Sequence, residues 1–257
     1  MSNGNNKISA LLITFNEEDN ILEVLENLSF ADEIIVVDSY STDKTVELIT
    51  KMPQISLFQR VFKNYTDQKQ FALEQAQNEW VLFLDADERM PDPLIKEVLE
   101  VVNKNGTTAS AYYFLRTFMF KKQILRFSGW QTDKNYRLFK RDKVRFSEDR
   151  IVHETLIVDG PSGTLKNKLI HYSYQNYYEY RSKMIKYGRM KAEEEFEKGK
   201  KAHWYHFLFR PFYKFFNHYF LRLGILDGKK GMIICYLNAL GVWSRYKALK
   251  ELNKANR

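Results

Sequence analysis

Short apolar runs alternate with helical patterns through the first hundred residues, and this alternation limits the fold more than any other feature of the sequence. The runs that predict strands cover residues 8–14, 33–37, 55–60 and 80–84. The segments with helical spacing cover residues 18–28, 44–51, 66–77 and 91–103, with Thr66 as the expected N-cap of the third. Strands separated by helices pair in parallel through right-handed crossovers. The sequence therefore predicts an α/β domain with a mostly parallel, Rossmann-like central sheet flanked by helices.

The pattern changes after Gly106. Residues 109–120, 135–140, 151–158 and 164–173 predict strands of mixed or antiparallel type, with a turn at residues 159–161. The chain is predicted to be helical from Asn176 onward, and the run of charges at residues 193–198 predicts a solvent-exposed helix face. We therefore expect three segments, residues 1–105, 106–175 and 176–257, the last of them a C-terminal helical extension.

The composition is that of a globular protein with a basic C-terminal segment. Hydrophobic residues make up 44% and charged residues 28% of the 257, which excludes disordered and collagen-like chains. A single cysteine, Cys235, excludes an internal disulfide and a cysteine-rich metal site. The net charge is +8, but residues 200–257 hold 12 Lys and Arg against 2 Asp and Glu. Because no recognised nucleic-acid-binding signature accompanies this charge, we expect no nucleic acid partner.

The sequence carries no signal for export and no segment that could cross a bilayer. The apolar run at residues 8–15 has only Lys7 as a basic flank and is followed at once by acidic residues. The longest apolar stretch, residues 231–243, has 13 residues and includes Asn238. These features predict a cytoplasmic protein without a transmembrane helix.

The basic segment is also rich in aromatic residues, with 13 of the 39 Phe, Trp and Tyr of the chain. Between residues 203 and 222 the polar residues form one narrow stripe at helical spacing, and all others except Pro211 are aromatic or leucine. Such a helix packs into a core or an oligomer, or lies in a membrane interface where its basic groups meet anionic lipid. We expect peripheral membrane contact through residues 203–247, with residues 231–243 beside the helix, at the inner face of the cytoplasmic membrane.

Polar and acidic residues follow the predicted strands at the points where the strands end. Thr14 to Glu17 follow the first strand, Asp38 the second, and Asp85 and Asp87 the fourth. In a doubly wound sheet these ends converge on one crevice. The Asp38 carboxylate can accept the N3–H of a uracil, or it opens the following turn. Asp85 and Asp87 can bind a divalent cation such as Mg²⁺ or Mn²⁺ together with phosphate oxygens, or they precede the next helix as entry residues.

Three strings around these residues resemble the N-terminal signatures of family 2 glycosyltransferases, which have the GT-A fold. The strings are ISALLITFNEE at residues 8–18, IVVDSYSTDKT at 35–45 and WVLFLDADE at 80–88. They are most similar to the subgroup that includes lipopolysaccharide core β-glucosyltransferases. The resemblance is strong over residues 7–100, continues weakly to about residue 175, and says little about the remaining segment.

The resemblance implies an inverting, metal-dependent glycosyltransferase. Residues 1–105 would form the nucleotide-sugar-binding half of a GT-A domain and residues 106–175 its acceptor-binding half. The donor would be a nucleotide-linked hexose, with UDP as the suggested nucleotide and Mg²⁺ or Mn²⁺ as the cofactor. The acceptor would be a glycan or a lipid-linked glycan, as in the synthesis of lipopolysaccharide core or another cell-envelope polysaccharide.

The resemblance also assigns roles to individual residues. The contacts to the nucleotide sugar fall on a set of strand-end residues and one helical lysine: Thr14, Phe15, Asn16, Glu17, Asp38, Asp85, Ala86 and Lys69. The resemblance implies that Asp87 binds the metal and that Asp85 binds either the metal or the ribose. His171 is a candidate for a further metal ligand or a structural histidine, and Lys69 could instead be a solvated helix position. Because many members have a second acidic residue where this chain has Ser39, Asp38 is the stronger candidate for reading the base.

An inverting transfer requires a general base that takes the proton of the acceptor hydroxyl. Asp149, in the pair Glu148-Asp149, matches the letters of the motif that carries the base in many family members. Glu154 follows His153 at a suitable distance after the Arg-Leu-Phe segment at residues 137–139, as in the subgroup. Burial between apolar strand neighbours would raise the pKa of Glu154 and favours it as the base. Alternatively, both carboxylates only pair with nearby arginines.

Two other functions fit parts of the pattern. An aspartate-dependent phosphotransferase also places two aspartates after a strand, although usually after an early one. A non-catalytic membrane-surface binding protein would account for the basic aromatic segment. Trp130 fits either a stacking contact with an acceptor sugar or a position in the core. The three ordered signatures favour the glycosyltransferase.

Overall fold

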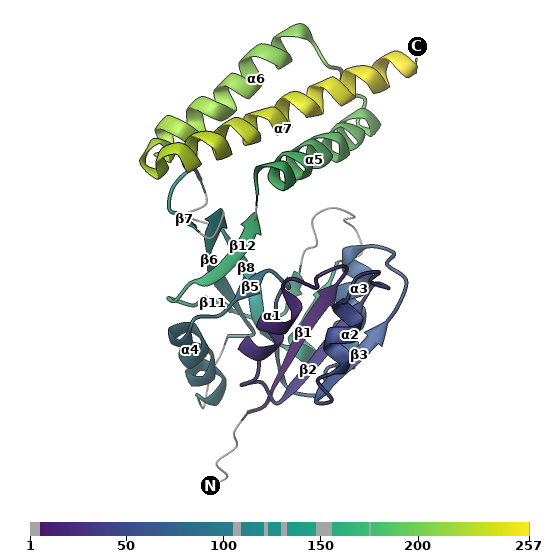
Figure 1. Cartoon of the computed structure of the whole chain (residues 1–257), viewed down its shortest axis with the longest axis vertical. Coiled ribbons are helices and arrows are strands. Elements are labelled where there is room, and N and C mark those ends of the chain that lie inside the picture. The colour runs from purple at the N-terminus through teal and green to yellow at the C-terminus, as the bar shows by residue number, and fades with distance from the viewer. Residues whose placement is uncertain are drawn as a thin grey trace. The chain divides into compact units, whose positions relative to one another are not determined.

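The computed structural model describes residues 6–104, 109–120, 123–129, 133–147, 156–174 and 176–256. Contacts divide the chain into two compact units, Met1–Arg116 with Lys134–His171, and Thr117–Asp133 with Tyr172–Arg257. The first unit is an α/β layer structure and the second is mainly helical (Figure 1). The helical unit thus takes in residues 117–133 in addition to the extension that the sequence predicts.

The first unit is built on a sheet with the strand order β3-β2-β1-β4-β8-β6. The strands are β1 (Ile8–Thr14), β2 (Glu33–Asp38), β3 (Ile55–Gln59), β4 (Trp80–Phe83), β6 (Ala111–Phe120) and β8 (Lys134–Lys140). Strands β1 to β4 pair in parallel, whereas β8 pairs antiparallel with both β4 and β6. The parallel half and the mixed half confirm the two patterns of the sequence.

Shorter strands complete this unit and correct one expectation. They are β5 (Glu88–Arg89), β9 (Val144–Phe146), β10 (Leu156–Val158), β11 (Ser162–Thr164) and β12 (Leu169–Tyr174). The strand predicted at residues 164–173 begins too early, because β12 begins only at Leu169 and Thr164 belongs to the separate strand β11. Between them the Glu97 carboxylate accepts the N–H groups of Lys166 and Asn167, at 2.7 and 2.9 Å, and this turn interrupts the strand.

Helices cover both faces of the sheet. One apolar cluster joins alternate residues of β1, such as Leu12, to α1 (Ile21–Asn27), α2 (Thr45–Thr50) and α4 (Asp92–Asn103). A second cluster joins Leu11, from the other face of β1, to α3 (Tyr65–Gln75) and to Phe146 of β9. Strands that are buried on both faces need continuous apolar runs, which explains the strong strand signals of the sequence.

Two helix starts differ from the sequence prediction. Helix α1 begins at Ile21 and not at residue 18, because Glu17 O accepts the N–H of Asn20 in a turn, at 2.9 Å. Helix α3 is capped by Asn64, whose side-chain oxygen accepts the N–H of Asp67 at 2.8 Å. Thr66 is buried inside the first turn, so its predicted role as the N-cap is wrong.

The second unit is built on the long helix α7 (Gly228–Ala255), which packs against α5 (Tyr177–Glu197) and α6 (Trp204–Phe216). The short strand β7 (Gln123–Leu125) contributes Leu125 to its core. Inside that core the Tyr180 hydroxyl donates to Asn238 Oδ1 at 2.6 Å. Helices α5 and α7 approach closely at Gly188, where an added Cβ would lie 2.6 Å from Gly241 O. No helix in the described ranges combines the length and apolarity needed to cross a bilayer.

Two features of the helical segment differ in detail from the sequence prediction. Residues 231–243 are not a separate segment beside the helix, because they belong to α7 and bury residues such as Ile234 and Leu237 in the core of this unit, and their contact with a membrane stays a prediction. The charged run at residues 193–198 is exposed at both ends but not throughout. Glu195 is buried and lies 3.6 Å from the Arg245 guanidinium, across the α5–α7 contact.

Candidate active site

The ends of β1 and β2 lie side by side, with Thr14 in register with Asp38. The Thr14 hydroxyl donates to Asp38 Oδ1 at 3.0 Å. Asp38 is fully buried, and its carboxylate also accepts the N–H and the hydroxyl of Ser41, at 2.8 and 2.5 Å. Asp38 therefore shapes the loop after β2, and its contact with a nucleotide base stays a prediction.

The loops that follow these two strands are joined by further hydrogen bonds. Asn16 has a left-handed backbone with a φ of 55°, and its N–H donates to Ser41 Oγ at 2.8 Å. In return, Asn16 Oδ1 accepts the N–H of Thr42 at 2.8 Å. The Glu17 N–H donates to Thr45 Oγ1 at 2.8 Å. Phe15 remains 57% exposed at this edge, where its ring is accessible for stacking.

The end of β4 lies beside these loops, since the Leu84 N–H donates to Leu11 O of β1 at 3.1 Å. Asp85 and Asp87 follow directly. Burial raises the pKa of Glu17, and the negative charges of Asp87 and Asp85 raise it further. Three carboxylates from two strand ends are thus within electrostatic reach of one another. Such a group of like charges is stabilised by a cation.

Asp85 takes part in a buried ion-pair cluster that was not predicted. The Arg137 guanidinium donates to Asp85 Oδ2 and, at 2.7 Å, to Glu88 Oε1. Arg116 lies 3.5 Å from the same Glu88 oxygen, and the Glu88 side chain is 0% exposed. Burial alone would raise the pKa of Asp85, but Arg137, together with Lys69 and His171, lowers it below its ordinary value.

Asp87 faces a histidine from another strand. Strand β12 pairs antiparallel with β5, which brings His171 into register with Glu88. His171 Nε2 lies 3.1 Å from Asp87 Oδ2, and their side chains are 12% and 27% exposed. Asp85 and Asp87 therefore have different surroundings, because Arg137 pairs with the first and an imidazole contacts the second.

The described residues contain no group of three or more His, Cys, Asp and Glu side chains arranged to hold a metal ion. Asp87 and His171 supply one carboxylate and one imidazole that are partly open to solvent. Mg²⁺ and Mn²⁺ favour oxygen ligands, and in nucleotide sites Mg²⁺ takes one or two carboxylates, substrate phosphates and water. This pair of side chains fits a divalent cation that is completed by a bound diphosphate.

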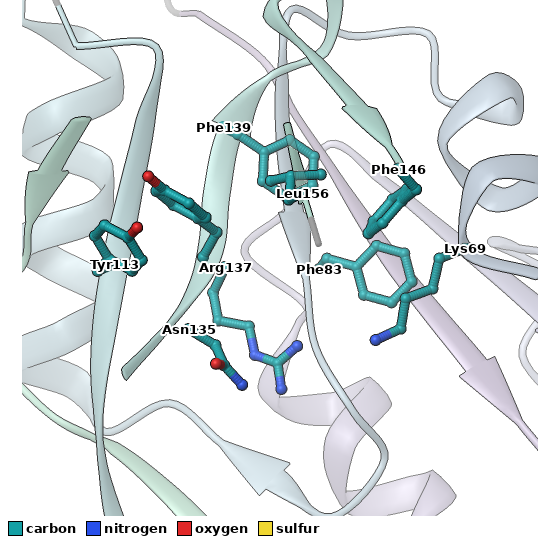
Figure 2. Close-up of a pocket in the computed structure, with 9 residues that line it drawn as sticks. Lys69, Phe83, Tyr113, Asn135, Arg137, Phe139, Phe146 and Leu156 are labelled. Atoms are coloured by element: carbon teal, nitrogen blue, oxygen red, sulfur yellow. The ribbon is translucent and has the colours of Figure 1, made fainter. Parts of the chain in front are cut away.

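A pocket of about 270 Å³ opens on the α3 side of β4 and β8, and it is lined by Lys69, Phe83, Tyr113, Asn135, Tyr136, Arg137, Phe139, Phe146 and Leu156. In Figure 2 the Lys69 amine and the Arg137 guanidinium point toward the same side of this pocket, while Phe83, Phe139 and Phe146 form its apolar wall. Lys69 is half-buried and lines this pocket, and its contact with a nucleotide sugar stays a prediction. Ala86, by contrast, is buried, and its carbonyl accepts from Arg89 at 2.7 Å.

Both candidates for the general base, Glu154 and Asp149, lie outside the described residues, as do Glu148, His153 and Trp130. The residues on either side of residues 148–155 are informative, because Phe146 of β9 and Leu156 of β10 pair with each other and both line the pocket. Described residues before and after the segment that carries the candidate bases therefore line the pocket.

The sequence analysis brought together the correct strand ends but missed Glu88, Arg116 and the ion-pairing role of Arg137. One signal was available. Arg137 stands in a strand next to two apolar residues, Leu138 and Phe139, where an inward-facing arginine requires a buried acidic partner.

Comparisons with known proteins agree with this geometry. Residues 9–158 match the family model for glycosyl transferase family 2. The chain is 30% identical over 263 residues to the lipopolysaccharide core biosynthesis glycosyltransferase LpsC of Rhizobium meliloti strain 1021, covering 95% of this chain and 94% of that protein. It is 28% identical over 257 residues to an uncharacterized glycosyltransferase of Rickettsia bellii strain RML369-C, covering 96% of this chain and 87% of that one.

A solved structure matches the fold over nearly the whole chain. The mannosyltransferase PcManGT from Pyrobaculum calidifontis, in complex with GDP-Man and Mn²⁺, has a TM-score of 0.52 and 17% identity, covering 98% of this chain and 74% of that one. The predicted GT-A fold is confirmed. Together these matches define the chain as a glycosyltransferase. It belongs to glycosyl transferase family 2, whose model covers more than half of its length.

Proposed function

We propose that this enzyme is an inverting, divalent-cation-dependent glycosyltransferase that moves a hexose from a UDP-sugar to a hydroxyl of a glycan or glycolipid. The acceptor belongs to lipopolysaccharide core or to another cell-envelope polysaccharide. The main support is the position of Asp87 and His171, whose side chains lie 3.1 Å apart where β4, β5 and β12 meet. The full-length similarity to LpsC supports the class of acceptor.

The proposed donor site follows the edge of the sheet. The nucleotide base and ribose lie against the loops after β1 and β2, with Thr14, Phe15, Asn16, Glu17 and Asp38 around them. Lys69 extends from α3 into the pocket beside Arg137, and it contributes positive charge next to Asp85. Asp85 and Ala86 continue this edge toward the sugar.

The reaction exchanges one bond for another at the anomeric carbon of the donor. The acceptor hydroxyl oxygen attacks this carbon from the face opposite the diphosphate, the bond between carbon and phosphate oxygen breaks, and the hydroxyl proton passes to a carboxylate. We assign that carboxylate to Glu154, with Asp149 as the second candidate, because the segment that carries both begins and ends at pocket-lining residues. No covalent intermediate with the enzyme is required.

Asp87 and His171 would hold the divalent cation, with Asp85 as an alternative ligand. The chemistry that the cation supplies is neutralisation of the charge on the leaving diphosphate. The Mn²⁺ and GDP-Man named for the Pyrobaculum mannosyltransferase agree with this assignment at the level of a shared fold. Arg137 keeps the Asp85 carboxylate ionised and oriented.

The enzyme works, in this proposal, on the cytoplasmic side of a membrane and contacts it through the segment 203–247. A lipid-linked acceptor requires such a location, because the sugar to be extended stays at the bilayer surface. The excess of basic residues in this segment supports the contact with anionic lipid.

A nucleotide-sugar panel with purified enzyme tests the catalytic proposal. Thermal shifts with UDP-sugars and GDP-sugars, with and without Mn²⁺, should show stabilisation by a UDP-sugar that depends on the metal. Asp87→Asn should lower sugar transfer by at least about 100-fold, since it removes a charged group at the leaving diphosphate. The matched control is Asp92→Asn, an exposed carboxylate in the first turn of α4, which should leave transfer unchanged.

The three parts of the proposal fail separately. Full transfer by Asp87→Asn in the presence of EDTA would overturn the metal role. Stabilisation by a GDP-sugar alone would overturn the choice of UDP. A product with the same anomeric configuration as the donor, determined by NMR, would overturn the inverting mechanism.

A further inference from the structure

Helix α6 leaves most of its aromatic residues exposed, which is unusual for a surface helix. None of its residues is buried, although most are aromatic. Its contact with α7 is mixed, because the His206 ring stacks on Tyr246 with centroids 4.5 Å apart and Phe207 packs against the same residue. Burial lowers the pKa of Lys214. Most of the aromatic residues are nevertheless turned away from the core of this unit.

The outward side of α6 carries six aromatic residues that are each at least 40% exposed: Trp204, Tyr205, Phe209, Phe212, Tyr213 and Phe216. We call these six residues the aromatic face. Phe212 is 65% exposed and Trp204 is 74% exposed, values that are unusual for such large apolar side chains. A contiguous apolar surface of this kind marks a contact with another molecule or a membrane.

The turn between α6 and α7 extends the apolar surface. Leu221, Leu223, Ile225 and Leu226 are all exposed there, between 47% and 63%. Leu223 has a left-handed backbone with a φ of 56°, a conformation that is unfavourable for leucine. The chain therefore adopts a strained turn that leaves aliphatic side chains in contact with solvent.

The charge around this surface has one sign. Asp227 is the only acidic residue between residues 198 and 250. Its carboxylate is buried and accepts the N–H groups of Arg126 and Phe127, at 3.0 and 2.9 Å. Arg210, Arg222 and Lys229 are exposed. The surface is thus apolar and cationic, without an exposed carboxylate.

We propose that the aromatic face of α6 and the adjoining turn form a monotopic membrane-binding surface that is selective for anionic lipid. Aromatic rings suit the boundary between headgroups and acyl chains, and the exposed cations complement anionic headgroups. A second copy of the chain fits this surface less well, because a two-fold contact would bring the cations of the two copies together. The inference rests on the proposed membrane location and assigns it to α6 and the turn, while the core of α7 stays outside the bilayer.

Vesicle co-sedimentation with the full chain tests this proposal. Wild-type protein should bind vesicles of phosphatidylcholine with phosphatidylglycerol more strongly than vesicles of phosphatidylcholine alone, and added salt should weaken the binding. Phe209→Ser combined with Phe212→Ser should weaken it at least about tenfold. Arg210→Glu combined with Lys229→Glu should weaken it at least about 25-fold, since each basic residue contributes about fivefold.

A matched control changes two exposed aromatic residues of α5 in the same unit. Tyr178 and Tyr187 are 77% and 49% exposed, and their replacement by serine should leave vesicle binding unchanged. Trp204 provides a second readout, because its fluorescence should shift to shorter wavelength when vesicles are added. Circular dichroism confirms that each variant is folded.

Equal binding by wild type and both double variants would overturn the proposal. So would a dimer in solution that Phe209→Ser with Phe212→Ser converts to a monomer, if vesicles are not bound, because the face would then join two copies. The thermal shift with UDP and Mn²⁺ separates this inference from the catalytic proposal. A normal shift without vesicle binding refutes only the membrane surface, and vesicle binding without the shift refutes only the catalytic assignment.

Discussion

Replacing Arg137 by methionine measures how far the buried carboxylates beside the active site depend on one guanidinium. The Arg137 side chain is 5% exposed, and its donor group lies 2.7 Å from Glu88 Oε1 as well as in contact with Asp85. Methionine fills a similar volume but leaves Glu88 with the more distant Arg116, at 3.5 Å. Removal of one partner of a buried ion pair costs about 3–5 kcal/mol. We expect the free energy of unfolding to fall by about that amount.

Urea denaturation followed by far-ultraviolet circular dichroism gives the free energy of unfolding of each variant. Adding Glu88→Gln to Arg137→Met should recover most of the loss, because the replacement of both partners of a buried pair is often nearly neutral. The matched control is Lys140→Met on the same strand. Lys140 pairs with Glu79 at 2.8 Å, but the two side chains are 25% and 50% exposed, so this change should cost no more than about 1 kcal/mol.

Two results would refute the reasoning. One is a loss for Arg137→Met as small as that for Lys140→Met, which would mean that the buried carboxylates do not need the guanidinium. The other is a double variant that is no more stable than Arg137→Met, which would mean that methionine destabilises the strand through packing and not through an unpaired charge.

Three further predictions concern single residues. Lys69→Met should raise the KM for a UDP-sugar about tenfold, as expected for a lost contact to a charged group, whereas the exposed Lys63→Met should not, in steady-state kinetics. Burial lowers the pKa of His218 to about 4, so its contribution to stability is present above pH 6.5 and is lost as the pH falls toward 4. Between pH 7 and pH 5 the loss should be no more than about 2 kcal/mol, and His218→Gln should flatten this part of the profile in thermal melts. Gly188→Ala should destabilise the helical unit by about 1–3 kcal/mol, because its Cβ would lie 2.6 Å from Gly241 O; Gly241→Ala, whose nearest atom lies at 3.2 Å, should cost less in calorimetry.

The strands of the parallel half could be predicted almost to the residue, because β1, β2 and β4 are buried and need uninterrupted apolar runs, although the edge strand β3 is only partly buried. The start of α3 could not, since Asn64 and Thr66 are both good caps and only the extended backbone at Asn64, with a φ of −160°, decides between them. The break between β11 and β12 depends on Glu97, a residue of α4 that is distant in the chain. Local patterns cannot contain that information.

The candidate site shows the same division. The contact of Thr14 with Asp38, and the position of Asp85 just after the neighbouring strand β4, follow from parallel topology, which the order of elements already implies. The pairing of Arg137 with Glu88 depends on the antiparallel register of β4 and β8, in which Leu82 lies opposite Leu138. The contact between His171 and Asp87 depends in turn on the pairing of β5 with β12. The register between two strands that are distant in the chain produces no periodic pattern in the sequence, so these contacts could not be predicted from it.

Helix α6 marks a different limit. Its sequence shows two faces of different width, but amphipathicity does not say which face meets the protein. His206 and Phe207 pack on α7 beside Tyr246, whereas most of the other aromatic residues of α6 are exposed. An apolar surface remains outside as a consequence.

The reciprocal hydrogen bonds between the loops after β1 and β2 have a consequence for the speed and entropy of ligand binding. Asn16 and Tyr40 already hold left-handed conformations, with φ values of 55° and 57°, and Asp38 already fixes Ser41. Fixing the backbone of one residue costs about 1–2 kcal/mol of free energy through lost conformational entropy. For these loops that cost is part of folding and does not reduce the free energy of ligand binding. A ligand that binds here should therefore meet a rigid receptor and associate in a single fast phase, without a slow conformational step.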